Sequence, residues 1–80
     1  MKFKEKLTEY EQAKESILYE LRADGPLTIK EIKSNIKETH PDHCLVYFDK
    51  AFAELLQEGY IIEYDPIPNT IPAYDINYDL

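Results

Sequence analysis

The hydrophobic pattern of this chain changes its period once, and that change constrains the fold more than any other feature. Up to residue 58 the apolar residues recur every three or four positions, which is typical of helices with one buried face. After Gly59 the chain continues with Tyr60-Ile61-Ile62-Glu63-Tyr64, which is rich in β-favouring residues. The pattern predicts an α+β domain in which helices come first and a β-hairpin comes last.

Helix-start signals place the first two helices. Thr8 and Glu11 have the spacing of a capping box, in which each side chain accepts a hydrogen bond from a backbone N–H of the first turn. Thr28 and Glu31 repeat this spacing. Gly59 is the expected stop of the third helix. We expect helices at about residues 8–23, 28–38 and 42–58, and strands at about 60–64 and 73–78.

The chain length limits the domain to one small core. A chain of 80 residues buries only ~60% of the surface that it exposes when unfolded. We therefore expect one domain over residues 1–80, without a deep cleft for a small-molecule substrate. Cys44 is the only cysteine, so no intramolecular disulfide is available and a cytoplasmic location is favoured over secretion. No apolar run approaches the ~20 residues of a membrane span, so no membrane association is expected.

Two segments resemble parts of a winged helix-turn-helix domain. Gly25-Pro26-Leu27-Thr28-Ile29-Lys30-Glu31-Ile32 resembles the entry to the second helix of that family. Phe52-Ala53-Glu54-Leu55-Leu56-Gln57-Glu58-Gly59-Tyr60-Ile61 resembles the end of its third helix and the turn into the wing. The resemblance covers roughly residues 8–78. It implies a winged helix, that is, a three-helix bundle followed by a C-terminal two-stranded antiparallel β-hairpin, the wing.

The resemblance also implies where such a domain would contact DNA. In this family the third helix usually enters the major groove, and the wing touches a neighbouring groove or the backbone. The outward positions of the third helix are His43, Tyr47, Asp49, Lys50, Ala53 and Glu54. The wing-tip positions are Asn69 and Thr70, and the lysines placed for phosphate contacts are Lys30, Lys33 and Lys37.

The charge distribution argues against the usual function of this family. The formal net charge is −7, and residues 51–80 contain no Lys or Arg. The acidic residues in that stretch are Glu54, Glu58, Glu63, Asp65, Asp75 and Asp79. Neutralised phosphates supply much of the affinity for DNA, and an acidic wing repels them. The lysines are better explained as a solvated helix face with local Glu partners than as phosphate contacts.

Tyrosines in the C-terminal part favour a protein interface instead. Tyr is enriched at interfaces because it combines a large area with a polar tip, and alternation along a strand cannot bury every one of them. The expected wing and interface residues are Tyr64, Asn69, Thr70, Tyr74 and Tyr78. We therefore expect a small non-enzymatic regulator that works chiefly through protein contacts, as a homodimer or an accessory factor.

Two other functions remain open at this point. One is a sequence-specific DNA-binding regulator that reads bases through His43, Tyr47 and Lys50. The other is an anti-regulator whose acidic wing imitates DNA and occupies a basic groove on another protein; net charge alone does not distinguish this from simple solubility.

A short cluster of His, Asp and Cys invites a metal or catalytic interpretation. His40, Asp42, His43 and Cys44 are all residue types that bind zinc. However, adjacent residues on a helix point ~100° apart, which hinders joint chelation by His43 and Cys44. The simpler interpretation is that Cys44 is a core residue and that His40 or Asp42 caps the helix. A Cys–His nucleophile pair lacks an orienting partner and an oxyanion site, so no metal, cofactor or catalytic residue is expected.

Overall fold

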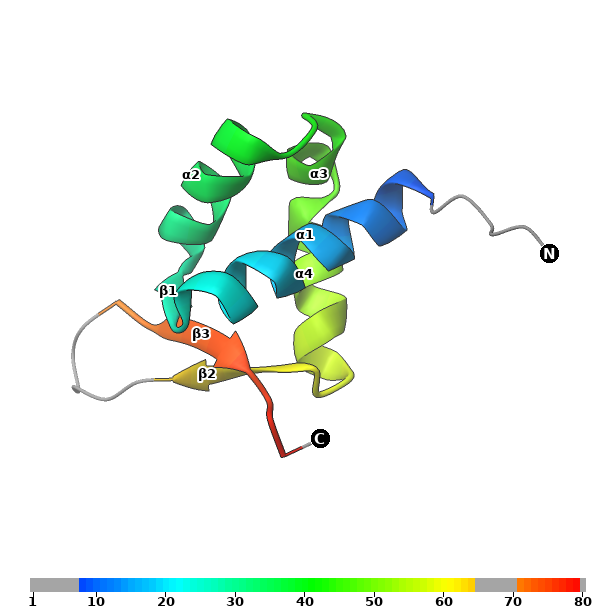
Figure 1. Cartoon of the computed structure of the whole chain (residues 1–80). Helices are drawn as coiled ribbons and strands as arrows, with labels where there is room; N and C mark the ends of the chain where they lie inside the picture. Colours follow the sequence, from blue (N-terminus) through cyan, green and yellow to red (C-terminus); the bar gives the residue numbers. More distant parts are fainter. Residues whose placement is uncertain (1–7, 65–70, 80) are drawn as a thin grey trace, which may run out of the picture.

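The computed structural model describes residues 8–64 and 71–79. These residues form an α+β fold of four helices and one three-stranded antiparallel sheet, which confirms the predicted class. The elements are α1 (Glu9–Asp24), β1 (Leu27–Thr28), α2 (Ile29–Thr39), α3 (His43–Val46), α4 (Phe48–Gln57), β2 (Ile61–Tyr64) and β3 (Ala73–Ile76), as Figure 1 shows.

Both predicted capping boxes are present and set the starts of α1 and α2. The Thr8 hydroxyl accepts a hydrogen bond from the Glu11 N–H at 3.1 Å, and the Glu11 carboxylate accepts one from the Thr8 N–H at 2.9 Å. Thr28 and Glu31 make the same pair of bonds at 3.2 and 2.9 Å. Each helix therefore begins one residue after its capping threonine, because the cap itself has extended backbone geometry.

The single third helix predicted over 42–58 is wrong, because the chain breaks at Tyr47 into α3 and α4. Tyr47 has φ −96° and ψ 7°, which lies in the bridge region rather than the helical region. The apolar spacing does not reveal the break, since Cys44, Phe48 and Phe52 keep their helical intervals across it and all are buried. The predicted side-chain cap is also wrong. Asp42 makes no capping hydrogen bond, and His40 ends α2 instead.

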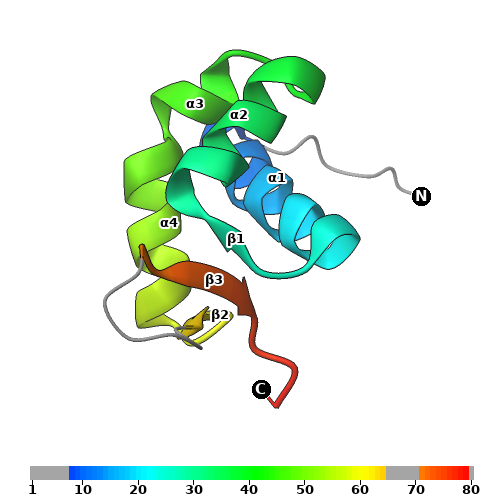
Figure 2. The ribbon, with the colours of Figure 1, turned by 90° about the vertical axis from the view of Figure 1, so that its left-hand side faces the viewer.

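The sheet contains a strand that the hydrophobic pattern did not predict. β1 pairs antiparallel with β3 through Leu27↔Tyr74 and Thr28↔Ala73, and the strand order is β1-β3-β2. Figure 2 shows β3 lying between the other two strands. The predicted hairpin is present as β2 and β3, but both strands are shorter than expected. A strand of two residues is too short to produce an alternating pattern.

The core lies where α1 packs against the other helices and the sheet. In Figure 1, α1 crosses α4, with α2 and α3 on one side and the sheet on the other. The buried apolar residues come from every helix and from β2: Ala13, Ile17, Leu21, Ile32, Ile36, Cys44, Phe48, Ala51, Phe52, Leu55 and Ile61. Among the described residues, no helix is both long enough and apolar enough to cross a membrane.

Candidate functional site

The residues predicted for the recognition surface are divided between two environments. His43 and Glu54 are half-buried and contact α1. The Nε2 atom of His43 lies 2.6 Å from the Oε1 atom of Gln12, and the Glu54 carboxylate accepts a hydrogen bond from the Tyr10 hydroxyl. Lys14 Nζ adds an ion pair to Glu54 Oε1 at 3.3 Å. These contacts join α1 to the third helical stretch, so His43 and Glu54 are already engaged within the fold.

The Tyr10–Glu54–Lys14 contacts also shift the pKa of each group. The hydrogen bond from Tyr10 lowers the pKa of Glu54, and the same bond raises the pKa of Tyr10. Partial burial alone would lower the pKa of Lys14, but the hydrogen bond and charge of Glu54 outweigh it and raise that pKa. All three shifts favour the same state, in which a carboxylate is held between a neutral phenol and an ammonium group.

The exposed part of α3 and α4 carries little charge. Asp49 and Lys50 are both exposed, and they contribute one charge of each sign beside the exposed Val46 and Ala53. Asp49 Oδ1 pairs with Lys33 Nζ of α2 at 3.4 Å. A helix that reads bases normally presents several donors and cations. This face offers one lysine and an apolar surface.

Tyr47 and Lys50 are the two other predicted recognition residues, and both lie beside Tyr10. The rings of Tyr47 and Tyr10 meet edge to face with centroids 6.3 Å apart. The Lys50 ammonium lies 5.2 Å from the centroid of the Tyr10 ring, a cation–π geometry.

The three lysines predicted to contact phosphates are all exposed on α2. Their positions, 30, 33 and 37, recur at helical spacing and so share one side of the helix. Lys33 is occupied by Asp49 and also lies 5.0 Å from the centroid of the Phe48 ring. Within residues 8–64 and 71–79, no ion pair is found for Lys30 or Lys37. They form a short basic strip without arginine.

The second predicted surface is the wing, and the register divides its side chains between two faces. Paired residues of adjacent strands point to the same side of a sheet. Ile62↔Asp75 and Tyr64↔Ala73 therefore form one face, opposite the face that carries the buried Ile61. We call Ile62, Tyr64, Ala73 and Asp75 the outer sheet face. Ile62 is 43% exposed and Tyr64 is 47% exposed.

The other predicted wing residues have different positions. Tyr74 lies on the inner face, where its ring meets that of Phe52 edge to face with centroids 4.8 Å apart. It therefore belongs to the packing around the core. Tyr78 is 72% exposed and follows β3. Asn69 and Thr70 lie outside the described residues. Ile62 was not among the predicted site residues, although its place in the β-favouring stretch 60–64 was the available signal.

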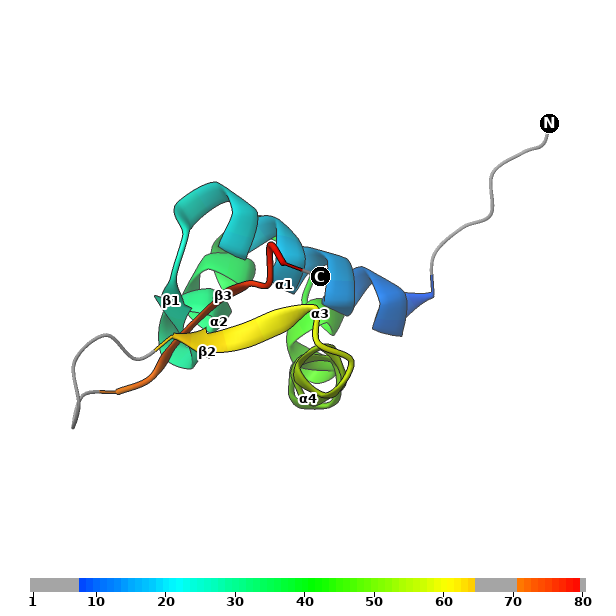
Figure 3. The ribbon, with the colours of Figure 1, turned by 90° about the horizontal axis from the view of Figure 1, so that it is seen from below.

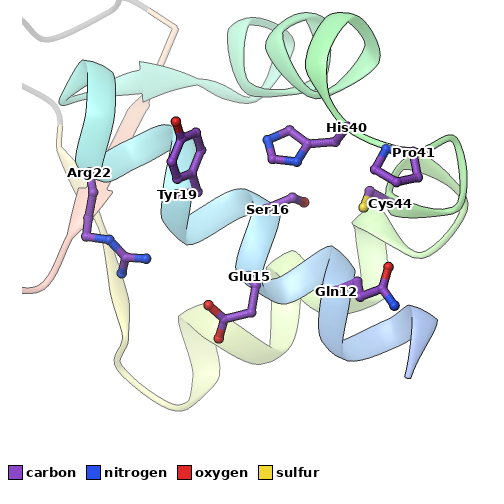
Figure 4. Close-up of a pocket in the computed structure, with 8 residues that line it drawn as sticks. All are labelled: Gln12, Glu15, Ser16, Tyr19, Arg22, His40, Pro41 and Cys44. Atoms are coloured by element: carbon purple, nitrogen blue, oxygen red, sulfur yellow. The ribbon is translucent and has the colours of Figure 1, made fainter. Parts of the chain in front are cut away.

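A shallow pocket of about 340 Å³ lies between α1 and the turn from α2 to α3 (Figure 4). Its lining residues are Gln12, Glu15, Ser16, Tyr19, Arg22, His40, Pro41 and Cys44. The Nε2 atom of His40 lies 2.9 Å from the carboxylate of the buried Glu20. Among the described residues, no group of three metal-binding side chains is placed to hold an ion, since His43 contacts α1 while Cys44 packs in the core.

The comparisons with known proteins found no match for this chain among protein-family models, curated proteins or solved structures.

Proposed function

We propose that this protein is a small non-enzymatic winged-helix regulator that acts mainly by binding another protein or a second copy of itself. The order of the described elements supports the winged-helix part of the proposal. Three helical stretches, the third broken at Tyr47, precede a hairpin that corresponds to the wing. Helix α2 and the broken stretch formed by α3 and α4 are joined by a short turn. Together they correspond to the helix-turn-helix.

The observation that carries the proposal is the outer sheet face. Ile62 and Tyr64 expose large apolar side chains next to each other on a single strand. Isolated exposed apolar residues are common, but adjacent ones rimmed by polar groups mark interaction surfaces. An acidic group lies at that rim, because Asp75 is opposite Ile62 on the same face. Such a surface is better suited to a protein partner than to the phosphates of DNA.

Site-specific cross-linking tests this proposal directly. A photoreactive p-benzoylphenylalanine at position 64 is expected to cross-link to a partner or a second copy in cells that express the protein, whereas the same group at position 19 is not. Tyr19 is also an exposed tyrosine, but it lies on α1. Tyr64→Ser should lower the yield of a cross-link placed at position 62. A protein that stays monomeric in sedimentation and yields no cross-link from position 64 would contradict the proposal.

Sequence-specific DNA binding is the second candidate, and the exposed Lys30, Lys37 and Lys50 are the observation in its favour. Duplex binding at two salt concentrations separates the candidates. Binding that depends only on lysine–phosphate contacts is expected to disappear at ~150 mM salt, because it is driven by counterion release. A sequence-dependent complex that persists at that salt would favour DNA recognition over protein binding. Imitation of DNA by the acidic wing would appear instead as competition with a duplex for a basic protein.

A further inference from the structure

We propose that the open edge of β2 binds an extended, lysine- or arginine-rich segment of a partner protein as a fourth strand of the sheet. This inference rests on the proposed function, because it names the partner and the binding mode at the wing. β2 is at the end of the strand order β1-β3-β2. Figure 3 views the molecule from below, and in that view no described helix or strand covers β2.

The hydrogen-bond pattern identifies which backbone groups of β2 are available. The Asn77 N–H donates to the Tyr60 carbonyl oxygen at 3.0 Å, which makes Tyr60 and Asn77 a hydrogen-bonded pair in the register. Such pairs alternate along antiparallel strands, so Ile62 and Tyr64 also direct their N–H and C=O groups toward β3. The N–H and C=O groups of Ile61 and Glu63 therefore point away from β3. Ile61 is only 1% exposed, so the groups of the exposed Glu63 are the accessible pair at the open edge.

The other side of β3 provides an internal check on this pattern. The same alternation directs the N–H groups of Tyr74 and Ile76 toward β1. Tyr74 pairs there with Leu27, but β1 does not extend opposite Ile76. The Ile76 N–H donates a hydrogen bond instead to the Asp75 carboxylate at 2.7 Å. Residues 8–64 and 71–79 show no corresponding bond for the outward groups of Ile61 and Glu63.

Charge determines the kind of segment that fits this edge. Glu63 is exposed on the edge strand itself, and residues 51–80 contain no cation. Lys14 of α1 is already paired with Glu54 at 3.3 Å and with Glu58 at 3.6 Å. A second copy of β2 would bring a further Glu63 against this edge, and like charges on paired strands are destabilising. A basic strand with alternate apolar residues would pair with Glu63 and cover Ile62 and Tyr64.

The direct test uses a blocked seven-residue peptide of alternating lysine and valine with the intact protein. Amide hydrogen exchange, followed by NMR, should slow at Glu63 by about tenfold or more when the peptide is bound, since its outward N–H gains a hydrogen bond. Exchange at Ile62 and Tyr64 should change little. A twin peptide with its three central amides N-methylated should bind about tenfold more weakly, because it cannot form the central backbone bonds.

A charge reversal tests the recognition of basic segments. Glu63→Lys should weaken binding of the lysine–valine peptide about tenfold and should favour a glutamate–valine peptide instead. Glu38→Lys is the matched control, since it makes the same change of net charge at an exposed position on α2. It should leave both affinities within about twofold of the wild type.

Two outcomes would overturn the inference in distinguishable ways. If the peptide perturbs the side chains of Ile62 and Tyr64 but leaves exchange at Glu63 unchanged, partners dock on the outer sheet face without adding a strand. The proposed function then stands while strand addition is wrong. If the lysine–valine peptide does not bind, or if Glu63 is protected by self-association without peptide, capture of a basic segment is wrong. The cross-linking at position 64 then decides on the proposed function separately.

Discussion

The Tyr10 hydroxyl donates a hydrogen bond to the Glu54 carboxylate and so ties the first turns of α1 to the middle of α4. The two residues are 44 positions apart in the chain. Glu54 was expected to face a partner, yet it accepts bonds from Tyr10 and Lys14 of the same domain. This link holds the helical stretch that follows the break at Tyr47 against α1.

Removing the phenolic hydroxyl should weaken this link. Tyr10→Phe leaves the ring against Tyr47 and removes the donor to Glu54. We expect the thermal midpoint to fall by a few degrees, since a charge-assisted hydrogen bond is lost. Tyr19→Phe is the matched control, because Tyr19 is exposed and no hydrogen bond of its hydroxyl is found among the described residues. Equal midpoints for the two variants would show that the bond contributes nothing to stability.

The lowered pKa of Glu54 makes the stability of the fold depend on pH in the acid range. The group has an ordinary pKa of 4.5 when unfolded, and its folded value lies below this. Its contribution is therefore fully present above about pH 4.5 and is lost as the pH falls through the folded pKa. The difference in unfolding free energy between the wild type and Glu54→Gln should be largest near pH 7 and should shrink on acidification.

Urea denaturation at a series of pH values measures this difference. Glu38→Gln serves as the control, because Glu38 is exposed on α2 and is found in no ion pair with another described residue. A difference in unfolding free energy between the wild type and Glu54→Gln that stays constant down to pH 3 would contradict the linkage.

The raised pKa of Tyr10 predicts the opposite trend in alkali. Its contribution to stability is fully present below pH 10.0 and is lost as the pH rises through the folded pKa.

Among the described residues, Phe48 is the largest fully buried side chain, and it stacks on Phe52 with ring centroids 5.5 Å apart. Phe48→Ala should lower the free energy of unfolding by about 3–5 kcal/mol, since it removes buried surface and leaves a cavity. Val46→Ala, only two residues away, should change it by no more than about 0.5 kcal/mol because Val46 is 75% exposed. Chemical denaturation monitored by far-UV circular dichroism measures both. Similar losses for both variants would contradict the described core.

Gly25 ends α1 with φ +77° and ψ −151°, a conformation that L-residues rarely adopt. Gly25→Ala should destabilise the fold by about 1–3 kcal/mol through backbone strain. A Cβ atom at this position meets no heavy atom within 4 Å, so steric clash does not contribute. D-alanine at position 25, introduced by chemical synthesis, has the opposite handedness and should leave stability unchanged or slightly increased. A loss of equal size for both alanines would show that strain is not the cause.

Local signals account for the parts of the fold that the sequence predicted. The two capping boxes involve residues three positions apart, and the apolar stripes of α1 and α2 repeat within a single turn. Glycine at the end of a helix needs only its own backbone freedom. Each of these features can be recognised from a few neighbouring residues, so no knowledge of the rest of the chain is required.

The candidate site was less predictable, because its parts depend on distant partners. The helical spacing of Glu54 is compatible with an outward position, and only the packing of α1 turns its carboxylate toward Tyr10. The strand alternation of Tyr74 was likewise compatible with either face. Its register with Glu63 places it on the inner side, against Phe52.

The sequence by itself determined the α+β class, the starts of α1 and α2 and most of the buried positions, since backbone capping and hydrophobic periodicity act over one or two turns. Only the tertiary structure decided that Tyr47 interrupts the third helix, that Leu27 and Thr28 join the sheet, and that β2 is left as an open edge. Those outcomes come from contacts between segments that are far apart in the chain. Short-range patterns do not indicate which distant segment will supply the hydrogen-bond partner of a given backbone group or the packing partner of a given side chain.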